Sequence, residues 1–168
     1  MDKLARHFYR VLLALACVAM VAAFVCVGLG VLARLAGWEL PGLDAYAGYA
    51  IAAALFLALP ATLLQGEHIR VTLVLERLPA PWRRGFEVFC LVAGTALAAW
   101  LAWFSVRLVW VSYQTHDVSP GADVTPLWIP QLAMALGCVG FLLVFAHALA
   151  ARWQGRDLIA PAHAAHTE

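Results

Sequence analysis

The sequence predicts an all-α integral membrane protein with four transmembrane helices and an interfacial amphipathic helix between the second and the third. Three observations lead to this fold class. First, 64% of the 168 residues are apolar and only 12% are charged, about half of the roughly 25% that soluble domains carry. Second, the apolar residues gather into four long runs. Third, most basic residues lie on one side of these runs. This composition excludes a soluble enzyme, a disordered chain and a disulfide-stapled secreted module.

The four runs cover residues 11–33, 45–64, 88–106 and 127–150, and none contains Asp or Glu. Each is long enough to span, because about 20 helical residues cross a hydrocarbon core of roughly 30 Å. Helices are expected because the bilayer core leaves unpaired backbone amides without water. The first run follows a basic segment, as a signal peptide would, but it exceeds the roughly 7–15 apolar residues of such a peptide. We therefore expect one membrane domain over residues 1–168.

The basic residues predict the orientation of the chain. Four spans place both termini and the segment between spans two and three on the same side of the membrane. The opposite side receives the loops 34–44 and 107–126, which contain Arg34 and Arg107. The positive-inside rule then places both termini in the cytoplasm, together with nine of the eleven Lys and Arg residues: Lys3, Arg6, Arg10, Arg70, Arg77, Arg83, Arg84, Arg152 and Arg156.

Residues 66–78 are too short and too charged to span, but they predict an amphipathic helix that lies in the membrane interface. The apolar residues follow helical spacing, and Pro79 and Pro81 would end the helix. A lone strand in this position would leave its edges unpaired. The residues expected to hold this interfacial arm against the lipid are Arg70, Val71, Val74, Leu75, Arg77 and Leu78.

The third span carries two features of a contact with a partner protein or with lipid. Gly94, Ala98 and Ala102 recur at four-residue spacing, which lets helices approach closely within a membrane. Trp100, Trp103 and Arg107 are spaced for one helix face. An aromatic belt with an arginine that reaches the interface is the simpler interpretation of the second group.

No residue pattern indicates catalysis, a metal or a cofactor. The net charge of +1 gives no basic field for nucleic acid. The four cysteines lie inside the spans, where they are expected to pack as small apolar residues. Proton coupling usually needs an intramembrane carboxylate, and the four runs have none. Only His147 lies within a span, and one histidine does not complete a bis-histidine haem site, although a partner could donate the second ligand.

The segment GEHIRVTLVLERLP, together with the run TPLWIP that enters span four, resembles the small membrane subunit of TRAP transporters, the tripartite ATP-independent periplasmic transporters of bacteria and archaea. The resemblance covers nearly the whole chain in span number and loop length. It implies a multi-pass protein of the bacterial inner membrane.

The resemblance also implies partners and a role. In that family a periplasmic binding protein delivers an organic acid to two membrane subunits, and an ion gradient drives uptake. The large subunit carries the substrate and sodium sites, and the small subunit acts as its scaffold. By this resemblance the chain is not an enzyme and has membrane lipids, the large subunit and the binding protein as partners. The alternative hypothesis is a membrane-anchor subunit of a redox enzyme, with or without bound haem.

Overall fold

The computed structural model describes residues 3–65 and 80–153, which form four α-helices: α1 (Lys3–Leu35), α2 (Leu43–Leu64), α4 (Ala80–Thr115) and α5 (Trp128–Trp153). All four are long and apolar enough to cross a membrane. The described residues contain no strand beyond an isolated bridge between Val118 and Pro126. The predicted all-helical class with four spans is therefore confirmed. The interfacial arm expected at residues 66–78 lies outside the described residues.

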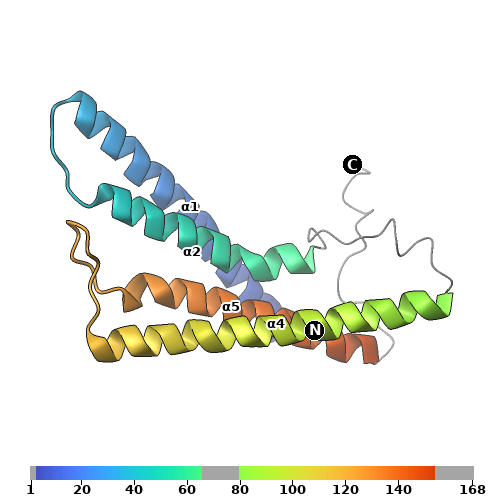
Figure 1. The fold of residues 1–168 in the computed structure, drawn as a ribbon. Coiled ribbons are helices and arrows are strands. Elements are labelled where there is room, and N and C mark those ends of the chain that lie inside the picture. Colours follow the sequence, from blue (N-terminus) through green and yellow to red (C-terminus); the bar gives the residue numbers. More distant parts are fainter. Residues whose placement is uncertain (1–2, 66–79, 154–168) are drawn as a thin grey trace, which may run out of the picture.

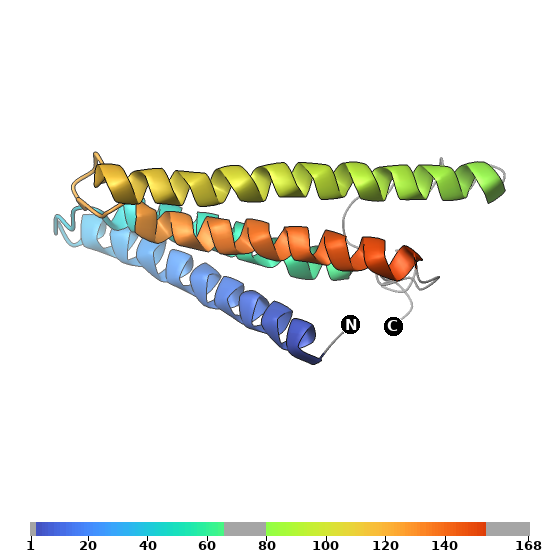
Figure 2. The same cartoon turned by 90° about the horizontal axis from the view of Figure 1, so that it is seen from below.

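The helices pack as two antiparallel hairpins, α1 with α2 and α4 with α5, that meet through α2 and α5 (Figures 1 and 2). Contacts between α1 and α5 are few, and α4 packs mainly on α5. The connections 36–42 and 116–127 lie together at one end, here called the loop end (Figure 1). The opposite end, where α1 begins and α5 ends, is here called the terminal end. The two central helices are α2 and α5.

The helix that extends furthest beyond the apolar run that predicted it is α4. The helix α4 continues through Arg107 to Thr115, so the second loop begins at His116 and not at residue 107 as expected. A single arginine does not interrupt helical hydrogen bonding, and the helix ends where His116 adopts a left-handed conformation with φ 54°. With 36 residues, α4 is about 54 Å long, well beyond the hydrocarbon thickness of roughly 30 Å.

A close backbone contact joins α5 to α2 at Gly137 and Phe56, one turn before Pro60. Proline has no backbone N–H and therefore leaves the carbonyl of Phe56, four residues earlier, without its usual helical donor. A Cβ atom added to Gly137 would overlap that carbonyl group and would lie 3.0 Å from the Leu57 nitrogen. Only glycine therefore permits α5 to lie this close to the α2 backbone.

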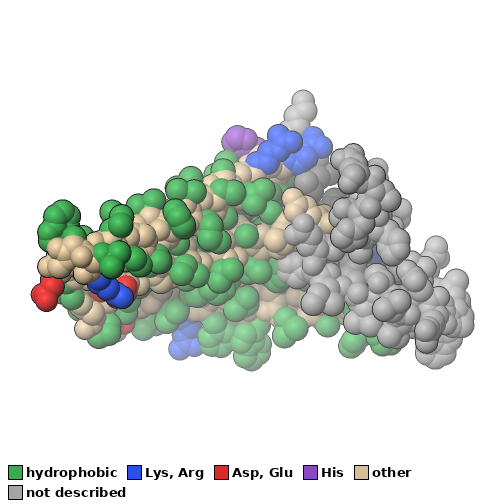
Figure 3. Space-filling view, turned by 90° about the horizontal axis from the view of Figure 1, so that it is seen from above, with side chains coloured by type: hydrophobic (Ala, Val, Ile, Leu, Met, Phe, Trp, Pro, Cys, Tyr) green, Lys and Arg blue, Asp and Glu red, His purple; other side chains and the backbone are tan. Residues whose placement is uncertain are grey.

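Most of the described surface is apolar, as Figure 3 shows for one face. In the most apolar stretches of α1 and α4 only 17% of the residues are buried, against 33% in α2 and α5. The buried residues near the terminal end come from three helices and include Tyr9, Leu63 and Val144. The outer faces of α1 and α4 are thus left to lipid or to another protein.

Candidate partner-binding surface

The small-residue stripe of α4 faces α5. Ala98 and Ala102 are 2% and 4% exposed. A Cβ on Gly94 would lie 2.5 Å from the Phe145 ring of α5. Further along the same stripe, the Ser105 hydroxyl contacts the buried sulfur of Cys138 at 3.3 Å. A contact of Gly94, Ala98 and Ala102 with a second protein would therefore require α4 and α5 to separate, and these three residues hold the chain's own hairpin together.

The aromatic residues of α4 lie on the opposite side of the helix and are exposed. Trp100 and Trp103 are 70% and 69% exposed, and Arg107 and Trp110 are exposed as well. Trp100 stacks on Phe104 with ring centroids 5.3 Å apart and an interplanar angle of 29°. The expectation that Trp100, Trp103 and Arg107 contact a partner or lipid stays a prediction, and this surface, here called the α4 aromatic face, is available for it.

The loop 116–127 is fastened to α2 through Asp123. The carboxylate accepts hydrogen bonds from the Ser119 hydroxyl at 2.8 Å and from the Tyr49 hydroxyl of α2 at 3.0 Å. Desolvation opposes ionisation, but hydrogen bonds with the side chains of Thr125, Ser119 and Tyr49 outweigh it and hold the pKa of the Asp123 carboxyl below its ordinary value. Gly42 begins α2 with φ 87°, and a Cβ there would lie 3.0 Å from the Asp123 Cβ. These contacts hold the loop against the start of α2, at the loop end of the bundle.

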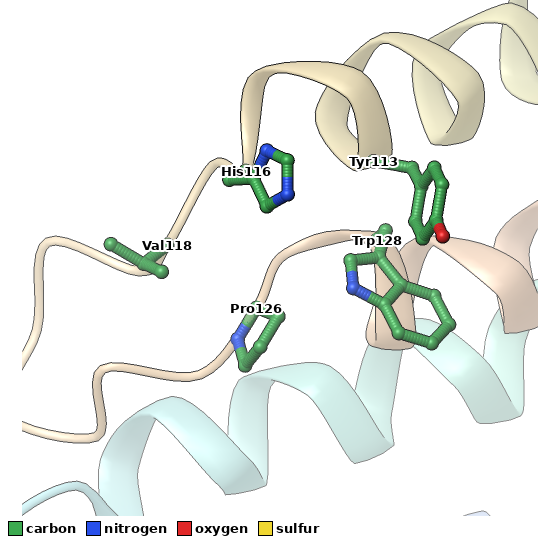
Figure 4. A pocket seen from close by; sticks show the side chains of 5 residues that line it. All are labelled: Tyr113, His116, Val118, Pro126 and Trp128. Atoms are coloured by element: carbon green, nitrogen blue, oxygen red, sulfur yellow. The ribbon is translucent and has the colours of Figure 1, made fainter.

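A small recess lies beside this loop. It lies between the end of α4 and the start of α5 and has a volume of about 180 Å³. The rings of Tyr113 and Trp128 meet edge to face at 5.8 Å and line one side (Figure 4). The other lining residues are His116, Val118 and Pro126. This lining supplies no Lys or Arg to neutralise a carboxylate substrate.

The histidine singled out in the fourth span is engaged within the chain. The Nδ1 atom of His147 is hydrogen-bonded to the Tyr9 hydroxyl of α1 at 2.8 Å, and the two rings meet edge to face. This bond joins α1 to α5 at the terminal end. A haem iron at His147 would therefore have only the other ring nitrogen to bind.

Two hydrogen bonds that link distant parts of the chain could not be predicted from the sequence, because each joins residues far apart in it. Tyr9 and His147 are 138 positions apart, and Tyr49 and Asp123 are 74 apart. The sequence did carry a signal for the close contact between α2 and α5. That signal is the presence of Pro60 in span two and of Gly137 and Gly140 in span four. A Cβ on Gly140 would lie 2.7 Å from Leu12 and 2.9 Å from Pro60, so these residues meet where α1, α2 and α5 converge.

Comparison with known proteins gives one family and one relative. Residues 23–155 match the family described as the DctQ component of tripartite ATP-independent periplasmic transporters. The C4-dicarboxylate TRAP transporter small permease protein DctQ of Rhodobacter capsulatus is 31% identical over 83 residues. That alignment covers 47% of this chain and 36% of the relative, so it spans little more than a third of the relative's own length. No solved structure matches the chain.

Proposed function

Because the chain belongs to the DctQ-component family of tripartite ATP-independent periplasmic transporters, we propose that it is the scaffold of the large membrane subunit during carboxylate uptake. In this proposal a periplasmic binding protein delivers the carboxylate, and an ion gradient drives its passage through the large subunit. The chain itself carries neither substrate nor coupling ion and catalyses no reaction. A transporter component of this family is a multi-pass membrane protein, in agreement with the four apolar helices.

The observation that carries the proposal is the exposure of the two flanking helices. Only 17% of the most apolar stretches of α1 and α4 is buried, so either helix could offer a broad surface to a large neighbour. Helices in lipid associate through packing and through hydrogen bonds that average about 0.6 kcal/mol each. A stable complex therefore needs contact along much of a helix, which an exposed flanking helix supplies.

The scarcity of carboxylates in the described spans supports a role without transport. Within the four spans the only carboxylate is Asp44, at the first turn of α2, where it pairs with Arg34 at 2.8 Å. Intramembrane carboxylates are the usual proton-coupling groups of transporters. The pairing of Asp44 at the loop end leaves it outside the middle of the membrane. The proposed substrate class, a C4-dicarboxylate or another carboxylate, follows from the name of the relative in Rhodobacter capsulatus.

The proposed orientation puts the terminal end in the cytoplasm and the loop end in the periplasm, because of the nine-to-two distribution of basic residues. We expect a reporter that is active only in the periplasm to be inactive when fused after Glu168. The same reporter inserted near Ser119 should be active. The reverse pattern would overturn the orientation while leaving the fold unchanged.

The scaffold role predicts that cells lose carboxylate uptake without this chain. In a strain that depends on the complete transporter for a labelled C4-dicarboxylate, deletion of the gene for this chain should reduce uptake to the level of a strain lacking the large subunit. Expression of the chain from a second locus should restore it. Undiminished uptake after deletion, with the large subunit still present in the membrane, would contradict the proposal.

A further inference from the structure

We propose that the α4 aromatic face binds a transmembrane helix of the large membrane subunit, and that a carboxylate of that helix pairs with Arg107 inside the bilayer. The inference rests on the proposed function and adds the contacting surface and the chemistry of the partner. The α4 aromatic face consists of Trp100, Trp103 and Arg107, with Phe104 and Trp110 beside them. Trp100, Trp103 and Arg107 differ by three, four or seven positions and therefore share one side of α4.

The contacts between α4 and α5 fix the depth of this face. Gly94 lies against Phe145, and Ser105 contacts Cys138, which is near the middle of α5. Trp100 and Trp103 fall between these two levels and therefore lie near mid-membrane. Tyr113 meets Trp128 at the loop end of α5. Arg107 precedes Tyr113 by six residues, so it lies about 9 Å deeper than that ring.

A purely hydrocarbon environment is energetically unfavourable for these side chains. Tryptophan favours the membrane interface, where its indole N–H finds an acceptor, and a donor without one is costly in the bilayer core. Charged side chains within transmembrane segments almost always face the interior of a bundle or pair with another charge. Arg107 is exposed on this chain. Within residues 3–65 and 80–153 Arg34 pairs with Asp44, whereas no carboxylate pairs with Arg107. The missing acceptors must therefore come from another molecule.

The direction of the side chains favours a protein over a lipid headgroup as the source of those acceptors. Side chains of a helix lean toward its N-terminus. The N-terminus of α4 lies at the terminal end, so Arg107 leans toward mid-membrane and away from the headgroups at the loop end. Trp100 lies about 20 Å from the level of Tyr113, beyond the reach of those headgroups. A neighbouring helix can present a carboxylate and other acceptors at both depths.

Photo-crosslinking tests the surface. The variant Trp103→p-benzoylphenylalanine is expressed together with the large subunit and irradiated in membranes. Phe24→p-benzoylphenylalanine on α1 is the matched control, because Phe24 is 79% exposed. We expect a crosslink to the large subunit from position 103 and none from position 24. A crosslink from position 24 alone, or from neither position while the two proteins still copurify, would overturn the inference and leave the proposed function standing.

The charge pair is tested by the variants Arg107→Gln and Arg107→Lys, with Arg34→Gln as the control for loss of an exposed arginine. The readout is the amount of large subunit that copurifies with the tagged chain, normalised to the chain present in the membrane. Arg107→Gln should lower it about tenfold, which corresponds to about 1.4 kcal/mol. Arg107→Lys should keep part of the binding, and Arg34→Gln should keep all of it.

Two other outcomes would overturn the inference. If Arg107→Gln retains the large subunit but loses bound phospholipid, measured by native mass spectrometry, a lipid phosphate is the partner of Arg107. If the unaltered chain retains no large subunit at all, the proposed function fails together with the inference. The two failures are thus distinguished by whether the unaltered chain copurifies with the large subunit.

Discussion

Replacement of Gly137 by alanine is expected to destabilise the chain more than any other single methyl group added to its helices. The new Cβ would overlap the Phe56 carbonyl of α2. Because the obstacle is backbone and not a flexible side chain, α2 and α5 must move apart to admit it. Overpacking of this kind costs about 1–3 kcal/mol, and backbone contacts belong to the upper part of that range. The midpoint of unfolding of the purified chain in a denaturing detergent should fall accordingly.

Gly28→Ala is the matched control for this prediction. Gly28 also lies within a long helix, but nothing lies within 4 Å of the position that its Cβ would take. Alanine favours a helix by up to about 1 kcal/mol over glycine, so this variant should unfold at the same or a slightly higher detergent concentration. Equal stability of Gly137→Ala and Gly28→Ala would show that the α2–α5 contact is looser than described.

The four spans could be predicted from the sequence because apolar runs of sufficient length have few alternatives to a helix in a membrane. The end of α4 could not be predicted in the same way. Arg107 ends the apolar run, but helical hydrogen bonding does not depend on side-chain polarity, so the helix continues to Thr115. A boundary based on hydropathy marks where the lipid environment changes and says little about where the helix ends.

The spacing of small residues identified a close contact but could not identify its partner. Gly94, Ala98 and Ala102 form a stripe that suits any approaching helix, and the sequence does not say whether that helix belongs to the same chain. In the structure it is α5. Trp100 and Trp103, which are two positions and one position from Ala102, were then left on the outer face. Which face turns inward depends on long-range packing, which neither spacing nor hydropathy records.

Omission of this chain from a purified transporter is expected to abolish uptake altogether, the largest effect in the account. The physical reason is that the large subunit would lose a broad surface that restrains it in the membrane. Under the proposed function the transport path lies in the large subunit and would remain intact. The large subunit alone should still insert and still bind its coupling ion, which separates a loss of support from a loss of the substrate site.

Reconstitution into liposomes tests the central claim most directly. Liposomes with an imposed sodium gradient receive this chain alone, the large subunit with the binding protein, or all three proteins, and uptake of a labelled C4-dicarboxylate is measured. The account predicts uptake only with all three proteins, and no more than protein-free liposomes show in the other two cases. Gradient-driven uptake by this chain alone would contradict the scaffold role, and full uptake without it would show that the scaffold is dispensable.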